Sequence, residues 1–313
     1  MRFSVKAPAS SANLGPGFDT LGLALDVWNE AIIDTDGEPG KVVNGGPEAA
    51  LLENHENLTL VAMNALARRM DRTLPPFSLE STTAIPVSRG MGSSAAALVM
   101  GLAATNHLLD LGLGLDELLR IAWEFEGHGD NVGAVVYGGA VLAIPGTARV
   151  ARLWSEGDLG LTAALFIPEE TGSTHIARSK LPSTIPHADG TFNVQAAASL
   201  ALGLERRDPE LIAAGMRDRL HEPYRAQMFP HLEPMKAAAI AAGAAGACLS
   251  GAGSTVLALV APEKASNVRD ALAEIGGGLD IPGRAEIVAP TTRGVEITPV
   301  PAGSSQSVEA QVG

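Results

Sequence analysis

The feature that most constrains this chain is a turn of glycine and serine that runs directly into a helix-forming segment. The turn spans residues 86–94, Pro-Val-Ser-Arg-Gly-Met-Gly-Ser-Ser, and an alanine- and leucine-rich run follows it to Leu109. A helix that begins there presents unpaired backbone N–H groups and the positive end of its dipole. Gly90 and Gly92 carry no Cβ, so the main chain can approach a bound group closely. The segment therefore predicts an anion site suited to a polyphosphate.

The residues of the turn alone leave three interpretations to weigh. A Walker A loop is excluded, because no lysine follows the last glycine. Gly90, Gly92 and Ala95 match the G-x-G-x-x-A pattern of Rossmann dehydrogenases, but residues 79–86 are polar and end in proline. A buried parallel strand would precede a Rossmann turn, so that match is weak. An ordinary glycine-rich helix cap is the third interpretation.

Residues 86–96 resemble the phosphate loop of the GHMP kinases, P-x-x-x-G-L-G-S-S-A-A, with Met91 in place of the usual leucine. Residues 6–19, Lys-Ala-Pro-Ala-Ser-Ser-Ala-Asn-Leu-Gly-Pro-Gly-Phe-Asp, are similar to the first motif of that superfamily in its homoserine kinase form. Residues 249–255, Leu-Ser-Gly-Ala-Gly-Ser-Thr, resemble the third motif, with Ser254 where many members have proline. Three motifs in the right order are far more specific than one loop, and they span nearly the whole chain.

The resemblance implies an α+β fold of two domains with the active site between them. Residues 1–155 would form the N-terminal GHMP kinase domain that binds ATP, and residues 156–300 a ferredoxin-like C-terminal domain. The polar, glycine-containing residues 155–160 are typical of such a boundary. Residues 301–313, rich in glycine, serine and glutamine, are expected to be a disordered tail.

Hydrophobic periodicity by itself predicts only a mixture of helices and strands. Alternation of Leu21, Leu23, Leu25 and Val27 predicts a strand with one buried face. Helices are expected over residues 57–70, 94–109, 116–125, 194–204, 208–220 and 263–275, and further strands over 137–144, 161–167 and 254–261.

Composition narrows the class of protein. The 313 residues are enough for two cores, which must be built from aliphatic side chains because aromatics make up only 4%. A formal net charge of −13 disfavours nucleic acid or an anionic membrane as partner. The single cysteine, Cys248, cannot form an internal disulfide and is expected to be a buried apolar residue. No apolar run reaches the ~20 residues of a membrane span, and no signal-peptide core is found, so we expect a cytoplasmic protein.

Residues 124–134, Glu-Phe-Glu-Gly-His-Gly-Asp-Asn-Val-Gly-Ala, could form a metal site, a proton-transfer pair or a solvated turn. Their E-G-H-x-D-N-V pattern resembles the homoserine kinase form of this region. The resemblance implies that Glu126 and Ser94 hold Mg²⁺, with Glu124 as the alternative ligand. It also places Asn131 where mevalonate kinase-like members carry an aspartate base. A neutral amide takes no proton, so transfer would rely on positioning and charge neutralisation.

The resemblance further implies that charged side chains hold an amino acid substrate. Arg178, in Ser-Thr-His-Ile-Ala-Arg, and Arg225, in His-Glu-Pro-Tyr-Arg, resemble the arginines that grip its carboxylate. On the residues alone, an ordinary salt bridge would explain either arginine. Asn13 and Asp19 would face the amino and hydroxyl end.

The resemblance thus implies ATP-dependent phosphorylation of L-homoserine in threonine biosynthesis, with ATP and Mg²⁺ as cofactors. The expected ATP-binding residues are Pro86, Val87, Ser88, Arg89, Gly90, Met91, Gly92, Ser93, Ser94, Ala95 and Ala96. The expected substrate-binding residues are Asn13, Asp19, Asp130, Asn131, Thr174, Arg178, Arg225, Gly251 and Gly253. The expected catalytic residues are Asn131, Ser94 and Glu126, the last two being also the metal ligands. The alternatives are a GHMP kinase for a neutral sugar or mevalonate, a non-catalytic relative, and a dehydrogenase; a homodimer is left open.

Overall fold

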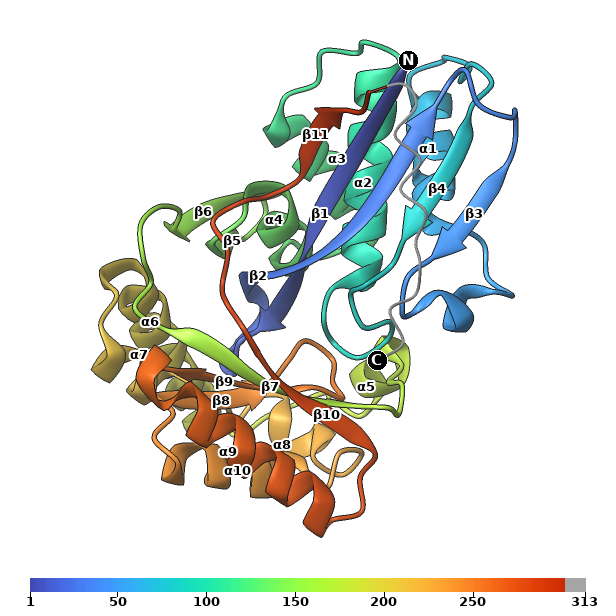
Figure 1. The fold of residues 1–313 in the computed structure, drawn as a ribbon. Coiled ribbons are helices and arrows are strands. Elements are labelled where there is room, and N and C mark those ends of the chain that lie inside the picture. Colours follow the sequence, from blue (N-terminus) through green and yellow to red (C-terminus); the bar gives the residue numbers. More distant parts are fainter. Residues whose placement is uncertain (302–313) are drawn as a thin grey trace.

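The structure, a computed structural model, describes residues 1–301 and contains two β-sheets (Figure 1). The expected tail therefore lies, apart from Pro301, outside the described residues. The first sheet has the order β11-β1-β2-β4-β3, and β5 and β6 extend it from β2. Its strands are β1 (Arg2–Asn13), β2 (Gly17–Asp34), β3 (Val42–Gly45), β4 (Ser78–Thr82), β5 (Ala140–Ile144), β6 (Arg149–Trp154) and β11 (Glu296–Pro299).

The second sheet has four antiparallel strands in the order β10-β7-β9-β8. They are β7 (Thr162–Pro168), β8 (Gly246–Leu249), β9 (Val256–Val260) and β10 (Gly283–Val288). Numbered along the chain, this order is 4-1-3-2, with helices between the first and second and between the third and fourth strands. That is the β-α-β-β-α-β arrangement of a ferredoxin-like unit.

Four helices cover one face of the first sheet, behind the strands in Figure 1. They are α1 (Leu58–Arg69), α2 (Ser93–Leu108), α3 (Leu115–Glu126) and α4 (Asp130–Tyr137). α2 packs on β1 and crosses α1 closely at Gly101, where a Cβ would overlap the backbone of α1. This close approach fixes the axis of α2, and with it the position of the turn at its N-terminus.

Four longer helices cover the two faces of the second sheet. α6 (His187–Arg206) and α7 (Pro209–Gly215) cover one face, and α9 (Leu232–Ala241) and α10 (Ala265–Gly278) the other. Alternate residues of β7 divide between the faces: Leu165 joins the core that continues into the first sheet, whereas Phe166 packs with α9 and α10. The short helices are α5 (Thr174–Ser179), α8 (Glu222–Arg225), η1 (Ala49–Leu52) and η2 (Pro262–Lys264). The two sheets therefore share one continuous core.

Several elements were predicted correctly and two details were wrong. Leu21, Leu23 and Leu25 are fully buried in β2, and Cys248 is buried in β8, where burial raises the thiol pKa. The strand expected from residue 137 begins at Ala140, because Gly138 and Gly139 have positive φ and end α4.

The helix expected over 208–220 ends at Gly215. The Asp218 carboxylate accepts the backbone N–H groups of Leu220, His221 and Glu222, which gives this segment a turn instead. β11, which falls within residues 156–300, pairs with β1 in the first sheet. None of the helices in residues 1–301 is long and apolar enough to cross a bilayer.

The crossing at Gly101 gives a stability prediction. In Gly101→Ala the new methyl group meets backbone atoms of α1 that cannot move independently, so we expect a loss of about 1–3 kcal/mol despite the better helix propensity of alanine. Gly277→Ala in α10 is the matched control, because no heavy atom lies within 4 Å of its added Cβ. That variant should gain about 0.5–1 kcal/mol. Urea denaturation measures both, and equal effects would contradict the proposed close crossing.

Candidate active site

The three sequence motifs meet around a cavity of about 1010 Å³. Every residue predicted to hold the substrate lines it: Asn13, Asp19, Asp130, Asn131, Thr174, Arg178, Arg225, Gly251 and Gly253. Ser94 and Glu126 line it as well. The structure therefore brings together residues that lie as far apart in sequence as the first and third motifs.

The turn before α2 is clamped between the other two motifs. Gly90 and Gly92 have φ of 76° and 70°, and Gly92 is the N-cap of α2. A Cβ at Gly90 would overlap the carbonyl oxygen of Ser250, and one at Gly92 would overlap the hydroxyl of Ser10. The Ser250 hydroxyl donates to the Gly90 carbonyl at 2.7 Å. Both glycines are thus required by their conformation and by their neighbours.

Not all of the predicted phosphate loop faces the cavity. The residues of the loop that line it are Val87, Ser88, Gly90, Met91, Gly92, Ser93 and Ser94. Pro86, Arg89, Ala95 and Ala96 are not among its lining residues.

Arg89 is buried, with Nη1 2.6 Å from Glu48 Oε2 and Nη2 donating to the Glu169 carbonyl at 3.0 Å. Its side chain therefore anchors the loop to the rest of the fold and does not point at a bound phosphate.

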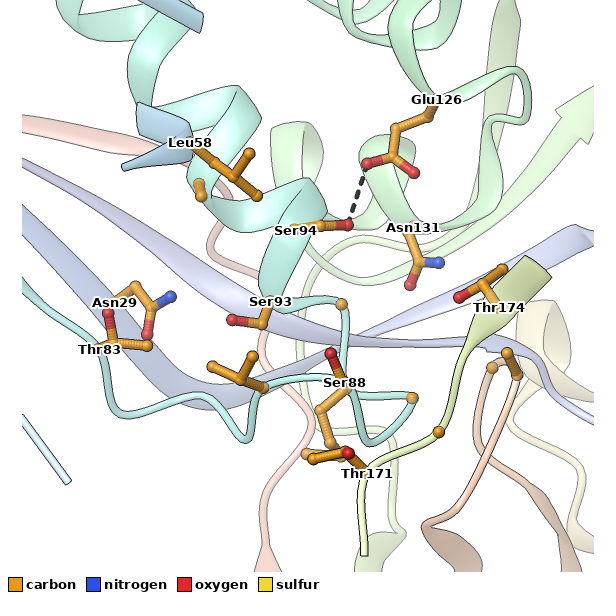
Figure 2. Close-up of a pocket in the computed structure, with 18 of the residues that line it drawn as sticks. Asn29, Leu58, Thr83, Ser88, Ser93, Ser94, Glu126, Asn131, Thr171 and Thr174 are labelled. Atoms are coloured by element: carbon orange, nitrogen blue, oxygen red, sulfur yellow. Dashed lines mark hydrogen bonds between the residues drawn. The ribbon is translucent and has the colours of Figure 1, made fainter. Parts of the chain in front are cut away.

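The side chains of Ser94 and Glu126 point toward each other in the lining of the cavity (Figure 2). Ser94 Oγ donates to Glu126 Oε1 at 3.1 Å, and Glu126 is the last residue of α3. Glu124, two residues earlier, points away and pairs with Arg69 and Arg120 at 2.5 and 2.9 Å. A hydroxyl and a carboxylate are the oxygen ligands that Mg²⁺ prefers, so these two residues fit such an ion and Glu124 does not.

Asn131, on the first turn of α4, lies below Glu126 and beside Thr174 in Figure 2. Its Oδ1 accepts a hydrogen bond from Ser10 Oγ at 2.9 Å, which leaves the amide NH₂ as the group free to face a ligand. The neighbouring Asp130 is buried and accepts from the Asn131 backbone N–H at 2.8 Å.

His128 pairs with Asp130 through Nδ1, at 2.9 Å. This hydrogen bond to a carboxylate is the main reason why the pKa of His128 is raised above its ordinary value, against the opposing effect of burial. Ligand atoms of Asp19, His128 and Asp130 lie within 4.8 Å of one another, but each already has a side-chain partner. His128 therefore acts on the loop and not as a metal ligand.

Two arginines and one aspartate form the charged end of the cavity. Arg178, on α5, makes a two-pronged ion pair with Asp19, with both N–O distances 2.8 Å. Arg178 and Arg225 both lie over the ring of Phe18, with Cζ 5.2 and 5.3 Å from its centroid. Arg225 donates to the Gly251 carbonyl at 3.0 Å, and Asn13 donates to the same oxygen at 2.7 Å.

Arg225 differs from Arg178 in its burial and its partners. It is 1% exposed, and within residues 1–301 it makes no ion pair. Burial lowers its pKa to about 10, with a further contribution from the charge of Arg178. A buried cation that borders a cavity without an anionic partner is a strong indication of an anionic ligand.

Comparison with known proteins agrees with this geometry. The family descriptions "GHMP kinases N terminal domain" and "GHMP kinases C terminal" match residues 57–139 and 200–277. The homoserine kinase of Moorella thermoacetica is 39% identical over 254 residues, which are 81% of this chain and 86% of that protein. The chain belongs to the homoserine kinase family of the GHMP kinases. The member of this family from Thermosynechococcus vestitus is 37% identical over 94% of this chain and 98% of its own.

The solved homoserine kinase of Cytophaga hutchinsonii has the same fold. Its TM-score is 0.84 at 28% identity, and the match covers 95% of this chain and 97% of that one. The two-domain α+β fold expected from the motifs is confirmed, and the Rossmann dehydrogenase interpretation is wrong.

Sequence reasoning missed part of the cavity that this homoserine kinase family member presents. Asn29, Leu58 and Thr83 line its far end (Figure 2), together with residues 51–52 and 54–57. Asn57 was recognisable only as a helix cap, yet its Nδ2 also reaches Asn44 and Ser81 at 2.8 and 3.0 Å. Ser10 and Phe18 were within the quoted first motif, and their contacts with Asn131 and the arginines could be found only in three dimensions.

The His128–Asp130 pair predicts a pH-dependent stability. Because the folded-state pKa of His128 is raised, the pair's contribution is fully present below the unfolded pKa of about 6.5 and is lost as pH rises through the folded pKa. The difference in unfolding free energy between wild type and His128→Gln should therefore be larger near pH 5.5 than near pH 9. Denaturant titrations at both pH values measure it, with the exposed His175→Gln as control. A difference that grows with pH would contradict the assignment.

Proposed function

We propose that this chain transfers the γ-phosphoryl group of ATP to the hydroxyl of L-homoserine, giving ADP and O-phospho-L-homoserine, a step of threonine biosynthesis. The observation that carries the substrate assignment is the buried, unpaired Arg225 beside Asp19 in the cavity of the phosphate loop. The names of the relatives support the same reaction.

The charges of the cavity match a zwitterion. A substrate carboxylate would compensate Arg225, and a substrate ammonium would compete for Asp19, which releases Arg178 toward the same carboxylate. A neutral sugar would leave Arg225 unpaired, and mevalonate would offer Asp19 no cation. The amino acid is therefore the substrate class that satisfies both charges.

The turn before α2 indicates which end of the cavity would bind the phosphates of ATP. The N–H groups at the start of that helix would hold the phosphates of ATP, and residues 51–59 with 81–83 would receive the nucleoside. Ser94 and Glu126 would hold Mg²⁺, whose charge neutralises the phosphoryl oxygens during transfer. Asn131 would hold the attacking hydroxyl in line through its amide NH₂.

We further propose a division into an ATP-binding domain of residues 1–155 and a C-terminal domain from residue 156, with β11 returning to the first. The return of β11 to β1 and the extent of the two sheets support this division.

A substrate panel tests the assignment of the acceptor. ADP release should be fast with homoserine and at background with mevalonate, galactose or no acceptor. Arg225→Ala should raise the KM for homoserine by roughly 30-fold or more, because a carboxylate bound without its buried partner loses about 2–5 kcal/mol, while the KM for ATP stays within about threefold. Arg219→Ala, at a half-exposed arginine paired with Asp189, is the control. Equal turnover of galactose and homoserine would refute the assignment.

A pair of glutamate variants tests the metal ligands. Glu126→Gln should lower turnover by roughly 10²-fold or more while nucleotide affinity changes by less than about tenfold, because the ion's charge is needed as the phosphoryl group leaves. Glu124→Gln is the matched control, because it lies two residues away on the same helix and only loses surface ion pairs. Similar, small effects of both variants on turnover would remove Glu126 from the metal site.

A further inference from the structure

The guanidinium of Arg225 is held by hydrogen bonds to neutral groups. Within residues 1–301 no carboxylate forms an ion pair with it. Its Nη1 lies 3.0 Å from the Gly251 carbonyl oxygen and 3.3 Å from His221 Nδ1, and its Nε is buried without a hydrogen-bond partner in the described chain. The nearby carboxylates are engaged elsewhere. Asp218 accepts backbone N–H groups, and Glu222 binds Lys236 and the Leu249 N–H.

The contacts of His221 determine its protonation. Its Nε2 lies 2.7 Å from the Gly15 carbonyl oxygen, which only accepts hydrogen bonds, so Nε2 carries the proton. A guanidinium only donates, so Nδ1 must be the bare, accepting nitrogen. The imidazole is fully buried, and burial lowers its pKa, which keeps it neutral. Asp218, Glu222 and Arg225 are the charged groups around it, and the turn at Gly15 contributes only backbone.

His221 closes a ring of hydrogen bonds through both halves of the site. From Gly15 the ring runs through His221 to Arg225, and from there to the Gly251 carbonyl. Asn13 donates to that carbonyl and returns the ring to the backbone two residues before Gly15.

Asn13 also holds the Asp19 N–H through Oδ1, at 3.0 Å. The ring therefore fixes the cationic group at residue 225 relative to the anionic group at residue 19.

We infer that His221 is a positioning residue for amino acid recognition: its neutral Nδ1 holds the Arg225 fork in the orientation that receives the substrate carboxylate. The inference rests on the proposed function, because it assumes that this carboxylate binds Arg225. His221 touches no reacting atom, so its loss should weaken binding of the amino acid more than it slows transfer.

Two amide variants test the roles of His221 Nδ1 and Nε2 separately. In His221→Asn the side-chain oxygen occupies the place of Nδ1 and keeps an acceptor for Arg225, but the bond to Gly15 is lost. In His221→Gln the amide reaches the place of Nε2 and keeps the Gly15 bond, but Arg225 loses its acceptor. We expect the KM for homoserine to rise roughly 10- to 100-fold in His221→Gln and less than about threefold in His221→Asn, with kcat and the KM for ATP within about threefold in both.

A merely structural role would give a different result. The two variants would then lower the melting temperature but have similar KM values for homoserine, and that outcome would overturn the inference.

A second test, the ¹⁵N spectrum of the imidazole in the wild-type protein, needs no variant. It should show Nε2 protonated and Nδ1 bare at about pH 7 to 8, and a doubly protonated ring or the opposite tautomer there would also overturn the inference. If wild type itself shows no ADP release with homoserine, the proposed function fails; an unchanged KM in an active His221→Gln refutes only the role of His221.

Discussion

The site depends on the backbone of the third motif, because this one turn contacts both of the other motifs at once. The Ser250 carbonyl occupies the space that a Cβ at Gly90 would need, and the Ser250 hydroxyl binds the Gly90 carbonyl. The Gly251 N–H donates to the Ala12 carbonyl at 3.0 Å, and its own carbonyl accepts from Asn13 and Arg225. The turn belongs to the second sheet, so the same hydrogen bonds that join the two halves of the fold also shape the cavity. Displacement of this turn would disturb phosphate and amino acid recognition together.

Arg225 is a buried cation in the lining of the cavity, and within residues 1–301 it makes no ion pair. A buried cation is tolerated when dipoles face it, and here a carbonyl oxygen, an imidazole nitrogen and the face of Phe18 do so. None of these direct contacts is an anion, so the Arg225 guanidinium keeps donor groups for a carboxylate. This arrangement orients the guanidinium of Arg225 but gives it no ion pair within the described chain.

The amount that the sequence could predict differs between local and long-range features. The strand that contains Leu21, Leu23 and Leu25 could be predicted, because an alternation of apolar residues with a period of two is visible in a short stretch of sequence. The return of β11 to β1 joins opposite ends of the chain, and no local pattern encodes that pairing. The end of α7 at Gly215 depends on Asp218, whose carboxylate competes for the next N–H groups.

The candidate site shows the same limit. Motif resemblance identified most of the cavity residues, since the motifs themselves build its walls. It could not decide between Glu124 and Glu126, because residues two apart on a helix face in different directions and the register was open. It counted Arg89 among the ATP-binding residues of the loop, and it could not show that this side chain is buried against a distant residue, Glu48.

The acidic groups of the site all have partners, and this bears on the proposed transfer without a general base. Asp19 is paired with Arg178, Glu126 accepts from Ser94, and Asp130 is held by His128 and by the N–H of the next residue. Each carboxylate thus has a positive or hydrogen-bond-donating partner within the described chain. At position 131 an amide, oriented by Ser10, can hold a hydroxyl but cannot accept its proton while its oxygen is engaged. Phosphoryl transfer through a loose transition state needs little removal of that proton before the bond to phosphorus forms, so alignment and neutralised charge are the requirements that these residues meet.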